Sequence, residues 1–446
     1  MGKNILIVGF KRSGISAARL MKESGCNVYI YDEKPVGGGF DDVVSGDRSG
    51  LCYKAVFDGI DTAVLSPSVD INCQFVGRCR AAGIEVIGEI ECAYRAFKGV
   101  GPVTAVTGTN GKTTTTALIN DIYQSAGLKS AALGNIGIPF SDFIKEDIER
   151  AVVEVSSFQL ESIVEFRPDI AVFLNFAPDH LDRHKTEKEY FDAKLKIFEN
   201  QTERDFAVIN ADDEYLSDYF IKRKNADGLK AGVLYFSTRG RVRGAYADGG
   251  AIVFDDGKTA ACEVCKVLDV PLIGRHNVEN ALAAVSAAYA AGIPDGAIRA
   301  ALRSFKPAKN RIEFVKKVGE TAFYNDSKGT NIHAAIAAAR SMTGSFSLIL
   351  GGSDKGEDFG RLFAALPENV CEIFVTGANA KKITAAAKAG GYADRAFECA
   401  TLEECIKKAL KKSPQNILLS PASASFDRYK NYEERGADFV RIVNSI

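Results

Sequence analysis

The sequence has no long hydrophobic run, no excess of charge of one sign and no repeated segment of short period. No apolar run approaches the roughly 20 residues that a membrane-spanning helix needs. Lysine and arginine number 56 and aspartate and glutamate 57, for a net charge of −1, so the basic surface typical of nucleic-acid-binding proteins is missing. Residues 1–10 hold only a short apolar run ending at a glycine, which indicates a first β-strand rather than an export signal. These absences predict a cytoplasmic protein that neither spans a membrane nor binds nucleic acid.

Cysteine is present, but not in a pattern that indicates disulfides or metal. The ten cysteines are scattered, several of them inside apolar runs. Because no export signal is found, free thiols in a reducing cytosol are expected. Cys262 and Cys265 form an isolated CxxC pair. A structural zinc site needs a second pair at a suitable spacing, so packing is the preferred explanation for these two residues.

Short apolar runs alternate with helical patterns along most of the chain. Its 446 residues, 46% hydrophobic and 25% charged, have an ordinary globular composition and predict about three domains at ~150 residues each. The alternation predicts an α/β fold with mostly parallel sheets. We expect a Rossmann-like domain at 1–98, a central α/β domain at 99–306 and a second Rossmann-like domain at 307–446.

The expected elements can be placed by residue range. The glycine-rich segment 233–270 is predicted to be an antiparallel insertion, and 277–291 a helix. Strands are predicted at 5–8, 28–31, 63–65, 103–106, 151–155, 170–174, 347–350, 372–375 and 417–419.

The strongest local signal is the segment 106–114, VTGTNGKTT, which follows a predicted strand and opens a helix. Glycines let the backbone N–H groups curl inward at a helix N-terminus, where the helix dipole favours anions. Lys112 would reach the β- and γ-phosphates of a nucleotide, and the Thr113 hydroxyl would bind Mg²⁺. A plain glycine-rich turn is the weaker alternative, because the context fits on both sides. The residues expected to contact the nucleotide here are Gly108, Thr109, Asn110, Gly111, Lys112, Thr113 and Thr114.

Two other classes of nucleotide-binding protein are disfavoured. A GTPase switch would need an Asn-Lys-x-Asp motif, and no Asn-Lys pair occurs in the chain. A dinucleotide oxidoreductase would need the glycine pattern of a Rossmann turn. The segment 9–14 resembles that turn, but Lys11 stands where the second glycine should let a pyrophosphate approach the backbone. NAD binding is therefore not expected.

The phosphate loop lacks the usual first glycine, whose place Val106 takes, and its short form TGTNGKT resembles the Mur ligase superfamily. This superfamily builds peptidoglycan stem peptides and includes folylpolyglutamate synthase. Further segments match its motifs in order through all three predicted domains: 154–160, 175–182, 190–194, 274–280, 309–313 and 326–328. The resemblance implies a central domain of the P-loop ATPase type and an ATP- and Mg²⁺-dependent ligase that joins an acid to an amino acid.

Carried over position by position, the resemblance implies a metal and nucleotide site. Lys112, His180 and Lys194 would be catalytic, with Lys194 carbamylated by CO₂. A carboxylate at a strand's carboxyl end, here Glu154, suits Mg²⁺, as does the anionic oxygen of a carbamate. The implied metal ligands are Thr113, Glu154, His180 and Lys194. The implied further ATP contacts are Asn277, Asn280, Arg311 and Asp326.

The C-terminal segments 325–331, 351–355, 419–427 and 431–436 are most similar to the D-glutamate-adding branch of the family. That branch implies UDP-N-acetylmuramoyl-L-alanine, D-glutamate and ATP as substrates, an acyl phosphate intermediate, and a role in peptidoglycan precursor synthesis. A dicarboxylate needs cations and hydroxyl donors. The implied D-glutamate-side residues are Lys328, Thr330, Lys355, Ser425, Phe426 and Tyr432. The implied residues for the UDP-sugar are Gly14, Asp32, Asn135 and Gln159.

Some points stay open at the level of sequence. Ser68 stands where the family often has glycine, and Asn310 where histidine is common, so neither receives a role. Another Mur ligase or a folate-glutamylating enzyme remains an alternative, although the Asp-Asn-Pro-Arg motif of the diaminopimelate-adding relative is absent. We expect a monomer, but the sequence does not determine the oligomeric state.

Overall fold

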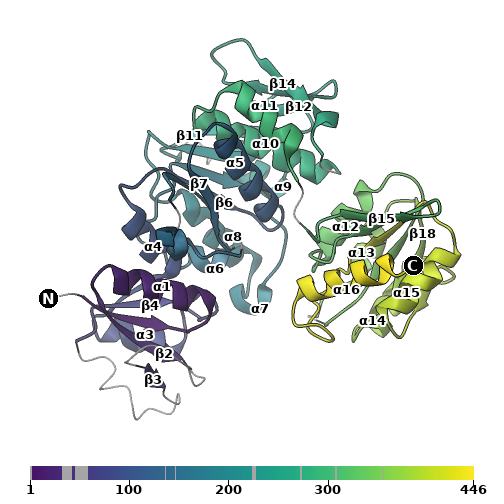
Figure 1. Ribbon diagram of the computed structural model, residues 1–446, viewed down its shortest axis with the longest axis horizontal. Helices are drawn as coiled ribbons and strands as arrows, with labels where there is room; N and C mark the ends of the chain where they lie inside the picture. Colours follow the sequence, from purple (N-terminus) through teal and green to yellow (C-terminus); the bar gives the residue numbers. More distant parts are fainter. Residues whose placement is uncertain are drawn as a thin grey trace. The chain divides into compact units, whose positions relative to one another are not determined.

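The computed structural model describes residues 3–32, 43–45, 59–135, 137–145, 147–223, 228–271, 274–306, 309–354 and 356–446. It has three sheets with helices between the strands, which confirms the predicted α/β class (Figure 1). Two compact units are present. The first comprises Met1–Asp269 with Glu279–Ser304, and the second Val270–Val278 with Phe305–Ile446. The domain boundaries near residues 98 and 306 remain predictions. Among the described helices, none combines the length and apolar character that crossing a lipid bilayer demands.

The first sheet has five parallel strands in the order β3-β2-β1-β4-β5. Alternate side chains of β1 point to opposite faces: Ile5 and Ile7 belong to one core cluster and Leu6 and Val8 to another. The three strands predicted here are confirmed. The elements are β1 Asn4–Val8, α1 Arg12–Glu23, β2 Asn27–Asp32, β3 Val43–Ser45, β4 Thr62–Leu65, α3 Gln74–Ala81, β5 Glu85–Gly88 and α4 Glu89–Phe97.

The second sheet has nine strands in the order β14-β13-β12-β11-β10-β9-β6-β8-β7. Its strands are β6 Val103–Thr107, β7 Ser130–Gly134, β8 Arg150–Glu154, β9 Ile170–Phe173, β10 Phe206–Asn210, β11 Gly232–Ser237, β12 Gly244–Asp248, β13 Ala251–Asp255 and β14 Cys262–Lys266. Its helices are α5 Lys112–Ser125, η1 Phe140–Lys145, α6 Ser157–Leu160, α7 Leu181–His184, α8 Glu187–Leu195, η2 Lys196–Phe198, α9 Glu214–Leu216, η3 Ser217–Lys222, η5 Val267–Asp269, α10 Arg275–Ala290 and α11 Asp295–Ser304.

The prediction of an antiparallel insertion at 233–270 is wrong for its first half. β11 pairs in parallel with β10, and β12 in parallel with β11, so these strands extend the central sheet. Within the described part of this segment, the antiparallel pairs are β12 with β13 and β13 with β14. Gly244 permits the parallel approach of β12, because a Cβ there would lie 1.9 Å from the carbonyl oxygen of Tyr235. Cys265 of the CxxC pair packs in the core, and both cysteines of the pair are free.

The third sheet has six strands in the order β15-β16-β20-β17-β18-β19, parallel except for β15. Helices α12 to α14 pack on one face, while α15 and α16 pack on the other. Since β20 lies between β16 and β17, the loops that follow these three strands meet at one edge. The elements are β15 Glu313–Val318, β16 Thr321–Asn325, α12 Ile332–Ser341, β17 Phe346–Leu350, α13 Gly360–Ala365, β18 Val370–Val375, α14 Ala380–Ala389, β19 Ala396–Glu398, α15 Leu402–Lys411, β20 Asn416–Leu419 and α16 Tyr432–Asn444.

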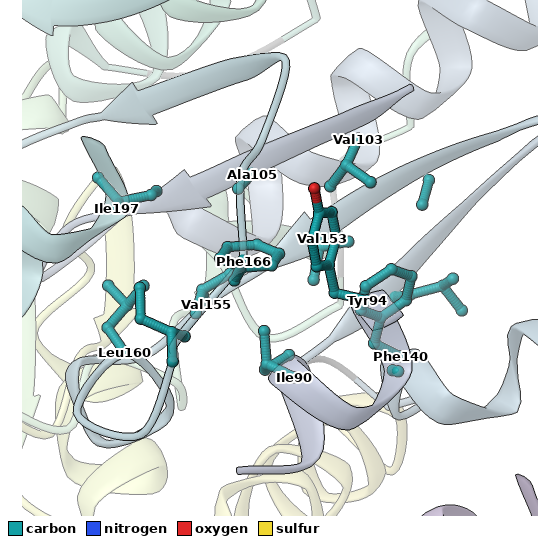
Figure 2. Close-up of a cluster of buried hydrophobic side chains, with 14 of the residues drawn as sticks. Ile90, Tyr94, Val103, Ala105, Phe140, Val153, Val155, Leu160, Phe166 and Ile197 are labelled. Carbon is teal, nitrogen blue, oxygen red and sulfur yellow. The ribbon is translucent and has the colours of Figure 1, made fainter. Parts of the chain in front are cut away.

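A hydrophobic core joins α4 of the first sheet to the second sheet (Figure 2). Ile90 and Tyr94 of α4 lie in one cluster with Val103 of β6 and Val153 of β8. The rings of Tyr94 and Phe166 meet edge to face with centroids 5.4 Å apart. The first two sheets therefore share one core, in keeping with their place in one compact unit.

Two buried carboxylates of α4 reinforce this junction. Glu91 accepts hydrogen bonds from the backbone N–H groups of residues 164–166 at 2.9–3.0 Å. Glu89 accepts from the backbone N–H of Ser141, at 2.7 Å, and from its hydroxyl. Burial raises the pKa of Glu89 to about 7, even though Ser141 opposes the rise.

The Glu89→Gln variant should be more stable than the parent at pH 8 but not near pH 4.5. Between about pH 4.5 and pH 7 the unfolded chain ionises Glu89 while the folded chain keeps it protonated. Stability of the parent therefore falls with rising pH up to about 7, at roughly 1.4 kcal/mol per pH unit. Glutamine keeps the acceptor for Ser141 without this loss. Denaturant unfolding at pH 5 and pH 8 measures the effect.

Glu85→Gln is the matched control, because Arg95 lowers the pKa of Glu85. The Glu85–Arg95 pair therefore stabilises the fold at high pH, and this stabilisation is lost as the pH falls. The pH dependence has the opposite sign to that caused by Glu89. A Glu89→Gln variant with the same midpoint shift at both pH values would contradict the prediction.

Candidate functional site

The phosphate loop lies between β6 and α5, as the sequence predicts. Gly108 and Gly111 have φ angles of 151° and 84°, which glycine adopts without steric cost. Asn175, just beyond β9, accepts from the N–H of Asn110 at 2.9 Å and donates to its carbonyl at 3.1 Å. The N–H of Thr109 donates to the Asn175 carbonyl at 3.0 Å. The neighbouring strand's end therefore holds the loop in shape.

The side chains of the loop are largely buried against the same region. Thr109 donates its hydroxyl to the carbonyl of Ala177 at 3.1 Å and accepts from the Ala177 N–H at 3.0 Å. Thr113 and Thr114 are buried in the first turn of α5. Backbone N–H groups at the start of this 14-residue helix can bind an anion. The arrangement suits a nucleotide phosphate.

Two lysines of the site share one acceptor. Nζ of Lys112 donates to the carbonyl oxygens of Gly108 and Thr109, at 2.7 and 2.8 Å. Nζ of Lys194, on α8, donates to the same Gly108 oxygen at 2.9 Å. Lys194 is only 1% exposed, and its amine lies 4.7 Å from the ring centre of Tyr190. Lys194 is thus a buried partner of the loop rather than a solvated helix residue.

Burial holds the pKa of Lys194 well below its usual range, and the nearby charge of Lys112 lowers it further. The negative charges of Asp179 and Glu154 raise the pKa of Lys194, but each by less than burial lowers it. Burial disfavours the charged form of an amine, so the lowered pKa favours the unprotonated form of Lys194. The unprotonated amine is the nucleophilic form that can add CO₂.

Glu154 is the last residue of β8, and its two carboxylate oxygens differ in their hydrogen bonding. Its Oε1 accepts from Nδ2 of Asn135 at 3.0 Å. Within the part of the chain that is described, its buried Oε2 has no hydrogen-bond partner. An unpaired buried carboxylate oxygen is costly, and a hard cation such as Mg²⁺ would satisfy it. The residue therefore fits the predicted metal role.

His180 lies in the left-handed region, with φ 55°, just before α7. Its ring packs 5.0 Å from Phe158 and 5.9 Å from Tyr190, whose ring also faces Lys194. No three His, Cys, Asp or Glu side chains gather as a metal site among the described residues. A cation held by Thr113, Glu154, His180 and Lys194 would therefore depend on a hydroxyl and a modified lysine as well.

Asn280, on α10, lies directly against the phosphate loop. A Cβ on Gly111 would be 2.3 Å from its Oδ1. Asn277 is also buried, but it belongs to the second compact unit, whereas Asn280 belongs to the first. The structure thus brings Asn280 to the loop.

The residues predicted for the UDP-sugar lie in the first unit. Asp32 accepts from the N–H of Phe10 at 2.6 Å, which ties it to the loop between β1 and α1. A Cβ on Gly14 would meet the carbonyl oxygen of Gly9 at 2.0 Å. Gln159 caps α6, where its Oε1 accepts from Ser156 at 2.9 Å. Asp32, at the end of β2, and Gly14, in the first turn of α1, therefore both lie against the short loop 9–11, while Asn135 lies beside Glu154.

The residues predicted for D-glutamate lie in the second unit, except that Lys355 is outside the described residues. Nζ of Lys328 lies 5.3 Å from the ring centre of Tyr432. The N–H of Thr330 donates to the Lys328 carbonyl at 2.9 Å. Ser425 is buried and its neighbour Phe426 is 71% exposed. Lys328, Thr330 and Tyr432 therefore form one group.

Asp326 is buried beside this group. It accepts from the Ser420 hydroxyl at 2.7 Å. Burial raises its pKa to about 7, and the nearby Arg311 opposes the rise. Arg311 and Asp326, both predicted to contact ATP, are therefore near each other.

Arg435, within the segment 431–436, received no role from the sequence although it is buried at this edge. Its guanidinium donates to the carbonyl oxygens of Ser327, Ser423 and Gly351, at 2.8, 3.0 and 3.3 Å. It thereby joins the loops that follow β16, β20 and β17. A buried arginine is costly unless its donors are paired. Burial of Arg435 is visible in the structure and not in the sequence, so the sequence carried no signal for it beyond its place in the segment 431–436.

Asn310 also received no role, and the structure gives it a positioning one. Its φ of 65° suits asparagine. Its carbonyl accepts from the N–H of Lys328 at 3.1 Å, and its side chain accepts from Asn325 at 2.9 Å. Asn310 therefore shapes the loop that carries Lys328. Ser68 is exposed, and nothing in the structure explains its presence in place of glycine.

Comparison with known proteins covers nearly the whole chain. Residues 106–288 match the Mur ligase middle domain, and 310–422 match the Mur ligase, glutamate ligase domain. The UDP-N-acetylmuramoylalanine--D-glutamate ligase of Thermoanaerobacter sp. (strain X514) is 40% identical, with 99% of this chain and 98% of that protein covered. The protein of that name from Koribacter versatilis (strain Ellin345) is also 40% identical, with 100% and 98% covered.

Solved structures agree on the fold. UDP-N-acetylmuramate-alanine ligase from Thermotoga maritima has a TM-score of 0.61 at 20% identity, with 99% of each chain covered. A pseudomurein peptide ligase type C from Methanothermus fervidus has a TM-score of 0.60 at 20% identity, with 100% of each chain covered. Taken with the site geometry and the full-length relatives, these matches show that the chain belongs to the Mur ligase family and is a ligase.

Proposed function

We propose that this chain, acting as a cytoplasmic monomer, ligates D-glutamate to UDP-N-acetylmuramoyl-L-alanine with cleavage of ATP to ADP and phosphate. The observation that carries the proposal is the pair of lysines at the Gly108 carbonyl, in a chain whose full length resembles ligases named for this reaction. The product would be a precursor of peptidoglycan.

The three sheets would divide the substrates among them. The region 1–98, with Gly14 and Asp32, would hold the UDP end. The region 99–306 would hold ATP on the loop at Lys112. The region 307–446 would hold D-glutamate, whose carboxylates need cations and hydroxyl groups. This division rests on the motif positions and on the contacts described above.

The chain's own residues would prepare the phosphoryl transfer. The loop N–H groups and Lys112 would bind the β- and γ-phosphates, and Lys112 would leave its carbonyl acceptors to do so. The neutral amine of Lys194 would add CO₂ and lose a proton, which turns a buried base into an anionic oxygen ligand. Thr113, Glu154, His180 and this carbamate would then hold Mg²⁺. When bound, Mg²⁺ neutralises the repulsion between the phosphates and the attacking carboxylate.

Two bond exchanges would complete the reaction. The alanyl carboxylate oxygen attacks the γ-phosphorus and ADP leaves, which forms an acyl phosphate. The amine of D-glutamate then attacks the acyl carbon, and phosphate leaves from a tetrahedral intermediate. Lys328, Thr330, Lys355, Ser425 and Tyr432 would orient the amino acid for that attack. Exclusion of water at this stage protects the acyl phosphate from hydrolysis.

A panel of amino acids and acceptors, with phosphate release as the readout, tests the proposal. We expect ATP cleavage to be stimulated by D-glutamate only when UDP-N-acetylmuramoyl-L-alanine is also present. L-glutamate, D-alanine and L-lysine should give background rates. Stimulation by L-glutamate with a folate acceptor would assign the chain to the other branch of the superfamily and overturn the proposal.

A further inference from the structure

The short helix α7, which begins directly after His180, is held by side chains of the α6 region. The ring of Phe158 lies 5.0 Å from the ring of His180 and stacks on His184 at 5.2 Å. The guanidinium carbon of Arg183 lies 4.7 Å from the Phe158 ring centre. His184 is buried and bonded to the Ser157 hydroxyl at 2.9 Å. One aromatic ring therefore contacts three side chains in and next to α7.

Arg183 extends from this cluster to the first sheet. Its Nη2 donates to Oε2 of Glu161 at 2.8 Å and to the carbonyl oxygen of Val69 at 3.0 Å. Its Nη1 reaches the carbonyl oxygen of Pro67 at 3.5 Å. Glu161 also lies 3.4 Å from Nδ1 of His184. Arg183 thus joins α6 and α7 to the loop 66–71 that follows β4.

That loop is part of the region assigned to the UDP end. The Ser66 hydroxyl donates to the carbonyl of Gly9 at 2.6 Å, at the turn that Asp32 also binds. Pro67, Arg183 and Gln159 line one pocket. Through Arg183, the UDP region and the segment with His180 are linked by a short chain of hydrogen bonds.

We propose that Arg183 is a positioning residue that couples the loop 66–71 to His180, so that binding of the UDP-sugar and the placement of His180 depend on each other. The proposal rests on the proposed function and deepens it. His180 has a strained φ of 55°, and such a conformation persists only where surrounding contacts determine it. The guanidinium reaches Glu161 and two carbonyl oxygens from two separate nitrogen atoms held in a rigid plane, whereas a lysine ammonium has all its donors on one nitrogen atom.

Steady-state kinetics of Arg183→Met and Arg183→Lys give the first test. We expect KM for UDP-N-acetylmuramoyl-L-alanine and the Mg²⁺ activation constant to rise roughly tenfold in Arg183→Met, since charge-assisted hydrogen bonds are lost. Arg183→Lys should fall between this variant and the parent. KM for D-glutamate should change less than twofold. Arg80→Met is the matched control, because Arg80, on α3, donates to the Ile71 carbonyl of the same loop in a bond that does not involve α7.

Hydrogen exchange of the purified protein, without substrates or metal, gives a second test that does not depend on activity. In Arg183→Met, exchange should quicken both in residues 66–71 and in residues 180–184, and in Arg80→Met only in the first segment. Quickening of one segment alone in Arg183→Met, or an equal rise of both KM values and the Mg²⁺ activation constant, would overturn the coupling. A parent protein that does not ligate D-glutamate would overturn the proposed function, while the exchange result still decides the coupling.

Discussion

Replacement of Lys194 by alanine should reduce ligase turnover by on the order of a hundred- to a thousandfold, the range seen when one preorganised charge-stabilising group is removed. The amine is fully buried, donates to the Gly108 carbonyl and has a pKa well below the usual lysine range. The variant can form no carbamate, so the proposed cation site loses its anionic oxygen ligand. Phosphate release at saturating substrates measures the loss.

Chemical rescue separates this role from a purely structural one. A short-chain carboxylic acid should restore part of the activity, because it can place a carboxylate in the space that the side chain leaves. High bicarbonate should not, since no amine remains to react. Lys188→Ala is the matched control: Lys188 is on the same helix, but its side chain is 83% exposed and pairs with Asp192. Near-normal turnover of Lys194→Ala would remove Lys194 from the mechanism.

Replacement of Gly111 by alanine should weaken binding of an ATP analogue with Mg²⁺ by more than about tenfold. Residue 111 has a φ of 84°, where an L-residue costs about 1–2 kcal/mol. The new Cβ would also lie 2.3 Å from Oδ1 of Asn280. Relief of this contact moves either the loop backbone or the start of α10 away from the phosphates. Isothermal titration calorimetry with a non-hydrolysable ATP analogue measures the loss.

Gly127→Ala is the control for backbone strain. Gly127 has a φ of 78°, and a Cβ there would have no atom within 4 Å. Both variants should lose similar stability from strain, but only Gly111→Ala should lose nucleotide binding. Parent-like affinity in Gly111→Ala would show that the turn at Lys112 is not where the nucleotide binds, and the proposed function would lose its basis.

Much of the secondary structure could be predicted from the pattern of neighbouring residues. The predicted strand 103–106, the glycine loop and the helix after it correspond to β6, the loop and α5. Each depends on neighbouring residues alone, through apolar periodicity and the backbone freedom of glycine. The motif resemblance added the family. The parallel pairing of β11 and β12 could not be predicted from local pattern, because the pairing of strands depends on packing between distant segments.

The unassigned residues of the candidate site share one feature, which is that their partners are distant in sequence. Arg435 bonds Ser327, 108 residues away, and Arg183 bonds Val69, 114 residues away. No spacing rule connects such pairs before the chain has folded. Glu89 and Glu91 likewise gain their partners only when α4 packs against the second sheet.

The α/β class, the phosphate loop and the order of the family motifs follow from the amino-acid sequence, since each is encoded in short stretches of chain. The burial and lowered pKa of Lys194, and the Glu154 oxygen that has no hydrogen-bond partner among the described residues, arise from the folded structure. Loss of water around a charged group depends on everything packed near it. That packing exists only once distant segments have come together.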